Sequence, residues 1–66
     1  MEIVVNGDHR KIEPGASVRS LLRELDVTES RVAVERNRIL VRKADYAGTA
    51  LADGDRIEIV TFVGGG

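Results

Sequence analysis

The sequence predicts a single α+β domain, a roll in which a five-stranded mixed sheet packs on one main helix. Two short β-rich segments precede the one clearly helical stretch, and three more follow it. Apolar residues make up 42% of the 66 positions, which is enough for one small core. A chain of this size forms one domain, so residues 1–66 are expected to share that core.

The N-terminal segment predicts a β-hairpin. Residues 2–5 are β-formers, and the alternation of a strand places Ile3 and Val5 on one face and Val4 on the other. The dipeptide Asn6-Gly7 is a strong hairpin signal, because both residues tolerate a positive φ. A second strand is therefore expected to return along the first.

This return strand is expected at residues 10–13, with Ile12 pointing inward. Asp8 and His9 are expected to lengthen the turn before it. His9, the only histidine, is predicted to be a solvated loop residue rather than a catalytic base. A general base needs a reacting partner and usually an orienting group, and the sequence offers neither.

One helix is predicted to follow Ser17, which is a good N-cap residue. Apolar residues then occur at the i, i+3, i+4 and i+7 spacing of a single buried stripe. The stripe consists of Val18, Leu21, Leu22 and Leu25. The helix is predicted to serve the core, and residues 26–30 are expected to form a loop.

The second half of the sequence predicts three further strands. Two are expected to form a hairpin around a tight turn at residues 36–38, and one helical turn is expected before Gly48. The strands span residues 32–35, 39–42 and 56–63, and the helical turn spans 43–47. The Asp53-Gly54-Asp55 segment lacks the ligand spacing and closing Glu of a calcium loop, so a turn before the last strand is predicted.

The two faces of the predicted sheet differ. The first and last strands, both rich in Val and Ile, are expected to lie parallel in its middle. Alternation assigns one set of apolar residues to the helix face: Ile3, Val5, Ile12, Val34, Val41, Ile57 and Ile59. It leaves Val4, Val60 and Phe62 on the opposite face, where they indicate a docking surface for a partner. The alternative is that Phe62 folds back over the sheet edge.

The last strand runs into three glycines, Gly64, Gly65 and Gly66. Glycine has no side chain to bury and loses the most backbone entropy on ordering, so this run adds nothing to a core. Residues 63–66 are predicted to be a flexible protruding tail, whose glycines reach about 10 Å beyond the last anchored residue. Such a thread fits a channel too narrow for other residues. The alternatives are a frayed terminus and a linker.

Charge and composition exclude several classes of function. Ten basic and eleven acidic residues give a net charge of −1, and the only aromatic residues are Tyr46 and Phe62. Nucleic-acid-binding proteins usually have a basic surface and exposed aromatic residues, so no nucleic-acid partner is expected. Without cysteine, no Cys/His metal site is expected. The absence of a visible signal peptide or membrane-length apolar run predicts a cytoplasmic protein without a membrane partner.

The whole chain resembles the ThiS family of sulfur carrier proteins of thiamine biosynthesis. The similarity rests on the length, on the helix that begins at Ser17, on the Val34-Glu35-Arg36-Asn37 motif, and on residues 53–60 followed by residues 62–66. The last two segments together are specific, whereas a terminal Gly-Gly alone is a weak signal. The resemblance implies the ubiquitin-like β-grasp fold, which agrees with the predicted strand order.

The resemblance also implies a chemistry at the C-terminus. In this family a ThiF-type adenylyltransferase uses ATP and Mg²⁺ to adenylylate the C-terminal carboxylate. A sulfur relay that involves a cysteine desulfurase converts it to a thiocarboxylate, which donates sulfur to thiazole synthase, ThiG. Carried to this chain, the reactive group is the Gly66 carboxyl, Gly64 and Gly65 belong to the thread, and Val60 and Phe62 contribute to the enzyme-facing surface.

A chain of this kind is a substrate of enzymes rather than an enzyme, and it binds no cofactor. An α-carboxyl has a pKa of about 3.5, so it is ionised at neutral pH and attacks the α-phosphate of ATP without a base. The acyl adenylate then reacts readily with sulfur because AMP is a good leaving group. The catalytic groups, with the Mg²⁺ that neutralises phosphate charge, reside on the partner.

Three alternatives stay open. A MoaD-like carrier delivers sulfur for molybdopterin synthesis, but the length and ending favour the thiamine branch. A ubiquitin-like protein modifier joins the activated Gly66 to a lysine of a target. A β-grasp interaction or RNA-binding module carries an incidental tail, and the balanced charge with few aromatic residues counts against RNA.

Overall fold

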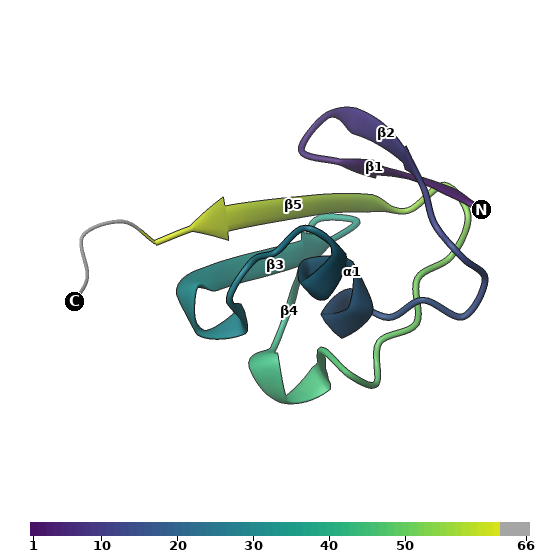
Figure 1. Cartoon of the computed structure of the whole chain (residues 1–66). Coiled ribbons are helices and arrows are strands. Elements are labelled where there is room, and N and C mark those ends of the chain that lie inside the picture. Colours follow the sequence, from purple (N-terminus) through teal and green to yellow (C-terminus); the bar gives the residue numbers. More distant parts are fainter. Residues whose placement is uncertain (63–66) are drawn as a thin grey trace.

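The computed structural model describes residues 1–62 and contains a five-stranded sheet with one α-helix packed on one face (Figure 1). The strands are β1 (Glu2–Val5), β2 (Asp8–Lys11), β3 (Val32–Arg36), β4 (Ile39–Val41) and β5 (Arg56–Thr61). The helix is α1 (Val18–Glu24), and the two 3₁₀ turns are η1 (Glu29–Arg31) and η2 (Lys43–Asp45). The predicted tail, residues 63–66, lies outside the described residues.

The strand order of the sheet is β2-β1-β5-β3-β4. As predicted, β1 and β5 are parallel neighbours, with Val4 opposite Arg56 and Val5 opposite Ile57. All other pairs of neighbouring strands are antiparallel. The last strand therefore joins the β1–β2 hairpin to the β3–β4 hairpin, and Figure 1 shows it between them.

The N-terminal hairpin is tighter than predicted. Asn6 and Gly7 have φ values of 49° and 87°, so these two residues alone close the turn. Asp8 and His9 pair with β1, so the prediction that His9 lies in a loop is wrong. Its side chain is exposed all the same, with Nδ1 3.0 Å from Glu2 Oε1. A two-residue turn whose twist matches that of the strands needs no additional residues.

Four strand ends also differ from the prediction. β3 ends at Arg36 instead of residue 35, and β4 ends at Val41 instead of residue 42. The second strand ends at Lys11, although Ile12 is buried as predicted. The last strand ends at Thr61, whereas the predicted strand continues to residue 63, which is not among the described residues. Each difference concerns one or two residues and leaves the assignment of faces unchanged.

A capping box explains why α1 begins directly after Ser17. The Ser17 hydroxyl accepts a hydrogen bond from Ser20 N–H at 3.1 Å, and the Ser20 hydroxyl accepts one from Ser17 N–H at 2.8 Å. The predicted stripe is buried at Val18, Leu21 and Leu22 and half-buried at Leu25. The loop predicted at residues 26–30 overlaps η1 at residues 29 and 30, a 3₁₀ turn that the sequence pattern did not indicate.

The core fills the space between α1 and the sheet. Its buried apolar residues are Ile3, Val5, Ile12, Val18, Leu21, Leu22, Val32, Val34, Tyr46, Leu51 and Ile57. Val41 and Ile59, predicted for this face, are partly buried against it. Tyr46 was not predicted here, yet it is 1% exposed, and its hydroxyl lies 3.5 Å from Val32 O. Burial raises the pKa of the Tyr46 phenol, and the charge of Glu29 raises it further.

Candidate functional site

In the described part of the chain, the edge of β5 that faces β1 has a neighbouring strand only at the beginning of β5. β1 pairs with it only at residues 56 and 57. The Asn6 side chain then takes the place of a strand. Ile59 N–H donates to Asn6 Oδ1 at 2.7 Å, and Asn6 Nδ2 donates to Ile59 O at 3.1 Å. Beyond Ile59, this edge of β5 has no further neighbour among residues 1–62.

On its β3 side, β5 is paired as far as Phe62. Phe62 N–H donates to Arg31 O at 2.7 Å. Arg31 ends η1, so the chain that precedes it turns away from the sheet. η1 is itself tied to α1, because the Arg19 guanidinium donates to both carboxylate oxygens of Glu29 at 2.9 and 3.2 Å. The fold thus holds the chain in place up to the residue before the predicted tail.

The sheet face opposite α1 exposes the apolar residues predicted for docking near this end of β5. Val60 is 60% exposed and Phe62 is 54% exposed. Leu40, 62% exposed, lies on the same face and was not predicted. The signal for it was present, because Val41 turns toward the core and its neighbour in β4 must point away. We call Val60 and Phe62 the docking face; Leu40 lies two strands away from β5, opposite Glu35.

Val4 shares this side of the sheet but does not adjoin the docking face. It is half-buried, and its neighbours across the sheet are His9 and Arg56. Arg56 precedes Val60 by four residues on β5, which corresponds to about 13 Å along the strand. The structure therefore separates Val4 from the other two residues predicted for docking.

Charged residues border the docking face. Glu35, Arg38, Arg56 and Glu58 line a depression of about 370 Å³. Glu35 and Glu58 lie directly opposite each other, an arrangement of like charges that is unfavourable in an isolated sheet. Within residues 1–62, none of the four forms a salt bridge. An apolar patch with unpaired charges at its border has the composition of a protein–protein interface.

A buried carboxylate fixes the start of β5. Asp55 is 6% exposed and accepts hydrogen bonds from Arg36 Nε at 2.7 Å, Asn37 Nδ2 at 3.0 Å and Ala52 N–H at 2.8 Å. Asn37 Oδ1 accepts one from Arg56 N–H at 2.9 Å. Burial alone would raise the pKa of the Asp55 carboxyl, but the hydrogen bonds from Ala52, Arg36 and Asn37 outweigh it and hold the pKa below its usual value.

This network extends what the sequence predicted for the segment before β5. The predicted turn is present, and Gly54 has a φ of 85°. Asp53 behaves as a turn residue, with Oδ1 accepting from Glu2 N–H at 2.8 Å. Asp55 has a different role, since it joins this turn to the β3–β4 turn. Two motifs that are separate in the sequence are thus one structural unit.

The described residues hold only part of the predicted site. They contain no group of three or more His, Cys, Asp or Glu side chains arranged to bind a metal ion. No helix among them is long and apolar enough to cross a membrane. Gly64, Gly65 and Gly66, with the predicted reactive carboxyl, lie outside them. The structure shows the end of β5 and the surfaces on either side of it.

The structure closely matches a solved one. It superposes on the crystal structure of the thiamine biosynthesis protein ThiS from Geobacter metallireducens with a TM-score of 0.85 and 32% sequence identity, over the full length of both chains. The five-stranded mixed sheet with one helix is therefore the β-grasp fold, as predicted.

Sequence comparison agrees with the structural match. The thiazole synthase of Paramagnetospirillum magneticum is 48% identical over all 66 residues. The chain spans only 20% of the length of that protein, and the same share of a second curated thiazole synthase. The sulfur carrier protein ThiS of Bacillus subtilis is 42% identical over 50 residues, which are 76% of each chain. The sequence model of the ThiS family matches residues 3–66, and the chain belongs to this family.

Proposed function

We propose that this protein is a sulfur carrier of thiamine biosynthesis and that the Gly66 carboxylate carries the sulfur. The observation that best supports this is membership of the ThiS family over residues 3–66. The fold is consistent with it, because β5 is held as far as Phe62 beside an exposed apolar face and leads into the glycine sequence. A partner that binds this face receives the following residues in a defined direction.

The proposed chemistry proceeds in three steps. A carboxylate oxygen of Gly66 attacks the α-phosphate of ATP, the bond to the leaving pyrophosphate breaks, and an acyl adenylate forms. The terminal sulfur of a persulfide formed by the desulfurase then attacks the acyl carbon and displaces AMP, which gives an acyl disulfide. A thiol cleaves its S–S bond, so the thiol is oxidised to a disulfide and the thiocarboxylate is released. A ThiF-type adenylyltransferase supplies Mg²⁺ and the catalytic groups of the first step, and a cysteine desulfurase is the source of the sulfur. This chain supplies the reacting carboxylate and the surface that positions it.

Thiazole synthase is the proposed acceptor of the sulfur. In two relatives, a region similar to the whole chain makes up a fifth of a protein named thiazole synthase. Domains joined in one chain meet at a high effective concentration, so such an arrangement suits a carrier that works beside its synthase. The same relatives favour the thiamine branch over a MoaD-like role.

Intact-mass spectrometry tests the carrier function. We expect incubation with a ThiF-type adenylyltransferase, Mg-ATP, a cysteine desulfurase with its substrate and a thiol reductant to replace one oxygen atom by sulfur, located at Gly66 by fragmentation. An unchanged mass in the presence of demonstrated enzyme binding would refute the carrier function. A covalent bond between Gly66 and a lysine of another protein would instead identify a protein modifier.

The docking face is expected to contribute more to partner binding than to folding. Truncating an aromatic residue at the centre of an interface often costs 2 kcal/mol or more, so Phe62→Ala is expected to weaken adenylyltransferase binding about 30-fold. Its melting temperature should stay close to wild type, because the ring is 54% exposed. Val4, at a distance from this face, is expected to contribute at the periphery.

Ile39→Ala is the matched control for this measurement. Ile39 is 71% exposed, but it pairs with Arg36 on the α1 side of the sheet. Calorimetric titration of both variants with the adenylyltransferase should show a loss for Phe62→Ala alone. Equal losses, or none for Phe62→Ala, would place the binding surface elsewhere.

A further inference from the structure

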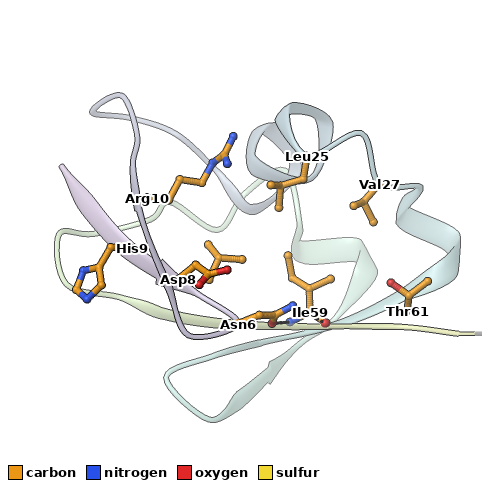
Figure 2. Close-up of a pocket in the computed structure, with 9 residues that line it drawn as sticks. Asn6, Asp8, His9, Arg10, Leu25, Val27, Ile59 and Thr61 are labelled. Atoms are coloured by element: carbon orange, nitrogen blue, oxygen red, sulfur yellow. Dashed lines mark hydrogen bonds between the residues drawn. The ribbon is translucent and has the colours of Figure 1, made fainter.

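A groove of about 340 Å³ runs along the α1 side of β5, on the opposite side of the sheet from the docking face. Figure 2 shows Ile59 and Thr61 of β5 pointing toward Leu25 and Val27, which lie at and just after the end of α1. Arg10 of β2 lies farther along the same groove. Because Leu25, Val27 and Ile59 are only partly buried, the groove offers apolar surface that the fold itself leaves open.

The main chain of Thr61 is open on this side. In an antiparallel pair, alternate residues direct their N–H and C=O groups to the neighbouring strand. Phe62 N–H donates to Arg31, so the N–H and C=O of Thr61 point the other way, toward the edge that β1 has left. Two residues earlier, the N–H and C=O groups of Ile59 also point to this edge, but both are hydrogen-bonded to the Asn6 side chain. Thr61 is thus the first position where another strand can pair with β5.

Asp8 and Arg10 bring one charge of each sign to the groove, and of the two Arg10 has a buried donor without an acceptor among the described residues. Its Nη2 lies 3.3 Å from Glu24 Oε1, longer than a strong charge-assisted hydrogen bond, and its Nε has no hydrogen-bond partner within residues 1–62. The Glu24 side chain is 53% exposed, so it is free to move aside. A carboxylate that replaces Glu24 accepts a hydrogen bond from Nη2, and when the guanidinium turns toward the groove it also accepts one from Nε, which is buried in the free protein. This is the bidentate arrangement that arginine favours.

We propose that an extended segment of thiazole synthase, with an apolar and an acidic side chain, adds to β5 as a strand at Thr61 and occupies this groove. Its main chain pairs with Thr61 N–H and C=O, its apolar side chain packs on Leu25 and Val27, and its carboxylate binds Arg10. Addition of a strand to an open sheet edge is an established mode of peptide recognition. The choice of partner rests on the proposed function, since a synthase that takes sulfur from Gly66 must approach the end of β5.

In this arrangement the partner contacts both sides of β5. The docking face lies on one side of β5 and the groove on the other, and the open edge at Thr61 lies between them. β5 is already paired with β3 as far as Phe62, and contacts on both of its sides fix the partner relative to this strand.

Amide hydrogen exchange measured by NMR tests the strand addition directly. With saturating thiazole synthase, we expect exchange of the Thr61 amide to slow by about tenfold or more, because it gains a hydrogen bond. The Val60 amide, which faces β3, serves as the internal control and should be protected in both states. Unchanged exchange at Thr61 in the complex, or no complex at all, would overturn the proposal. Protection of Thr61 without the synthase at high protein concentration would assign the edge to a second copy of this chain and overturn it too.

Substitutions provide the second test. Thr61→Pro removes the N–H of the open edge but no hydrogen bond to β3, so the melting temperature should change little while affinity for thiazole synthase falls about tenfold. Thr61→Val keeps the N–H and should bind as wild type. Arg10→Gln should weaken binding by a similar factor, and it keeps the proposal testable if Thr61→Pro fails to fold. Wild-type affinity in both Thr61→Pro and Arg10→Gln would overturn it.

Sulfur loading of the wild-type protein separates the two hypotheses. Failure of loading refutes the carrier function, whereas successful loading with unchanged exchange of the Thr61 amide refutes only the strand addition.

Discussion

Deletion of Gly66 is expected to lower the rate of sulfur loading by about 100-fold or more while leaving the melting temperature unchanged. The shortened chain still ends in a glycine carboxylate, but that carboxylate lies about 3.5 Å short of its original reach from Phe62. A misplacement of about 1 Å can already cost 100-fold in rate. Glycine buries no side chain, so the core is not affected. Single-turnover loading followed by intact mass, with thermal unfolding in parallel, measures both effects.

Gly64→Ala is the control that distinguishes the effect of the length of the C-terminal segment from the effect of its width. This variant keeps the full length and the same terminal carboxyl, and it adds one methyl group. We expect it to load faster than the deletion variant, because the carboxyl still reaches the α-phosphate. Loading of the deletion variant at the wild-type rate would contradict the assignment of Gly66 as the reacting residue, and a large drop in its melting temperature would indicate a structural role.

Substitution of Asp55 by alanine is expected to lower the free energy of unfolding by about 3 kcal/mol. The change removes three hydrogen bonds and leaves the Arg36 guanidinium, 34% exposed, without its carboxylate. A domain of this size has a total stability of about 3–10 kcal/mol, so the loss is a large fraction. The melting temperature should fall by roughly 15 °C, as measured by circular dichroism.

Asp53→Ala is the matched control, since it removes an aspartate from the same turn. The Asp53 side chain accepts one exposed hydrogen bond, from Glu2 N–H. It should cost about 1 kcal/mol or less. A loss as large as that of Asp55→Ala would show that the turn itself, rather than the buried network, is the source of the effect.

The Asp55 network also predicts how stability depends on pH. Because the folded protein holds the pKa of Asp55 below its usual value, the carboxylate contributes its full stabilisation above the pKa of the unfolded chain, about 3.9. That contribution is lost as the pH falls below this value toward the lower pKa of the folded state. The difference in stability between wild type and Asp55→Asn should therefore shrink below about pH 4. A difference that grows there would contradict the assignment.

Local sequence patterns were sufficient to predict the sheet, the helix and the faces of both. Helical periodicity places the apolar residues from Val18 to Leu25 on one side of the helix, which must face the core. Alternation in β5 places Ile57 and Val60 on opposite faces of the sheet. These features depend on residues within a few positions of each other. For the same reason the turn at Asn6-Gly7 was identified, although the strand was expected to begin two residues later.

The parallel pairing of β1 with β5 was predicted, but three other features that depend on distant residues were not. Whether Val4 lies beside Val60 is decided by the register between β1 and β5, which are about 50 residues apart in the chain, and that register separates them. Asp55 looked like a turn residue because its partners, Arg36 and Asn37, precede it by 19 and 18 residues. Tyr46 follows a single 3₁₀ turn, too short for a periodic pattern to show that its side chain is buried.

The position of β5 in the sheet has a consequence for synthesis of the protein. The β1–β2 and β3–β4 hairpins are each formed by neighbouring segments, but within the sheet they are connected only through this last strand. Neither hairpin alone has enough partners to be stable in water. On the ribosome the sheet therefore closes only after residues 56–61 have emerged, and its slowest step is expected to be the long-range pairing of the first strand with the last. A prematurely terminated chain consequently presents no folded surface to a partner protein.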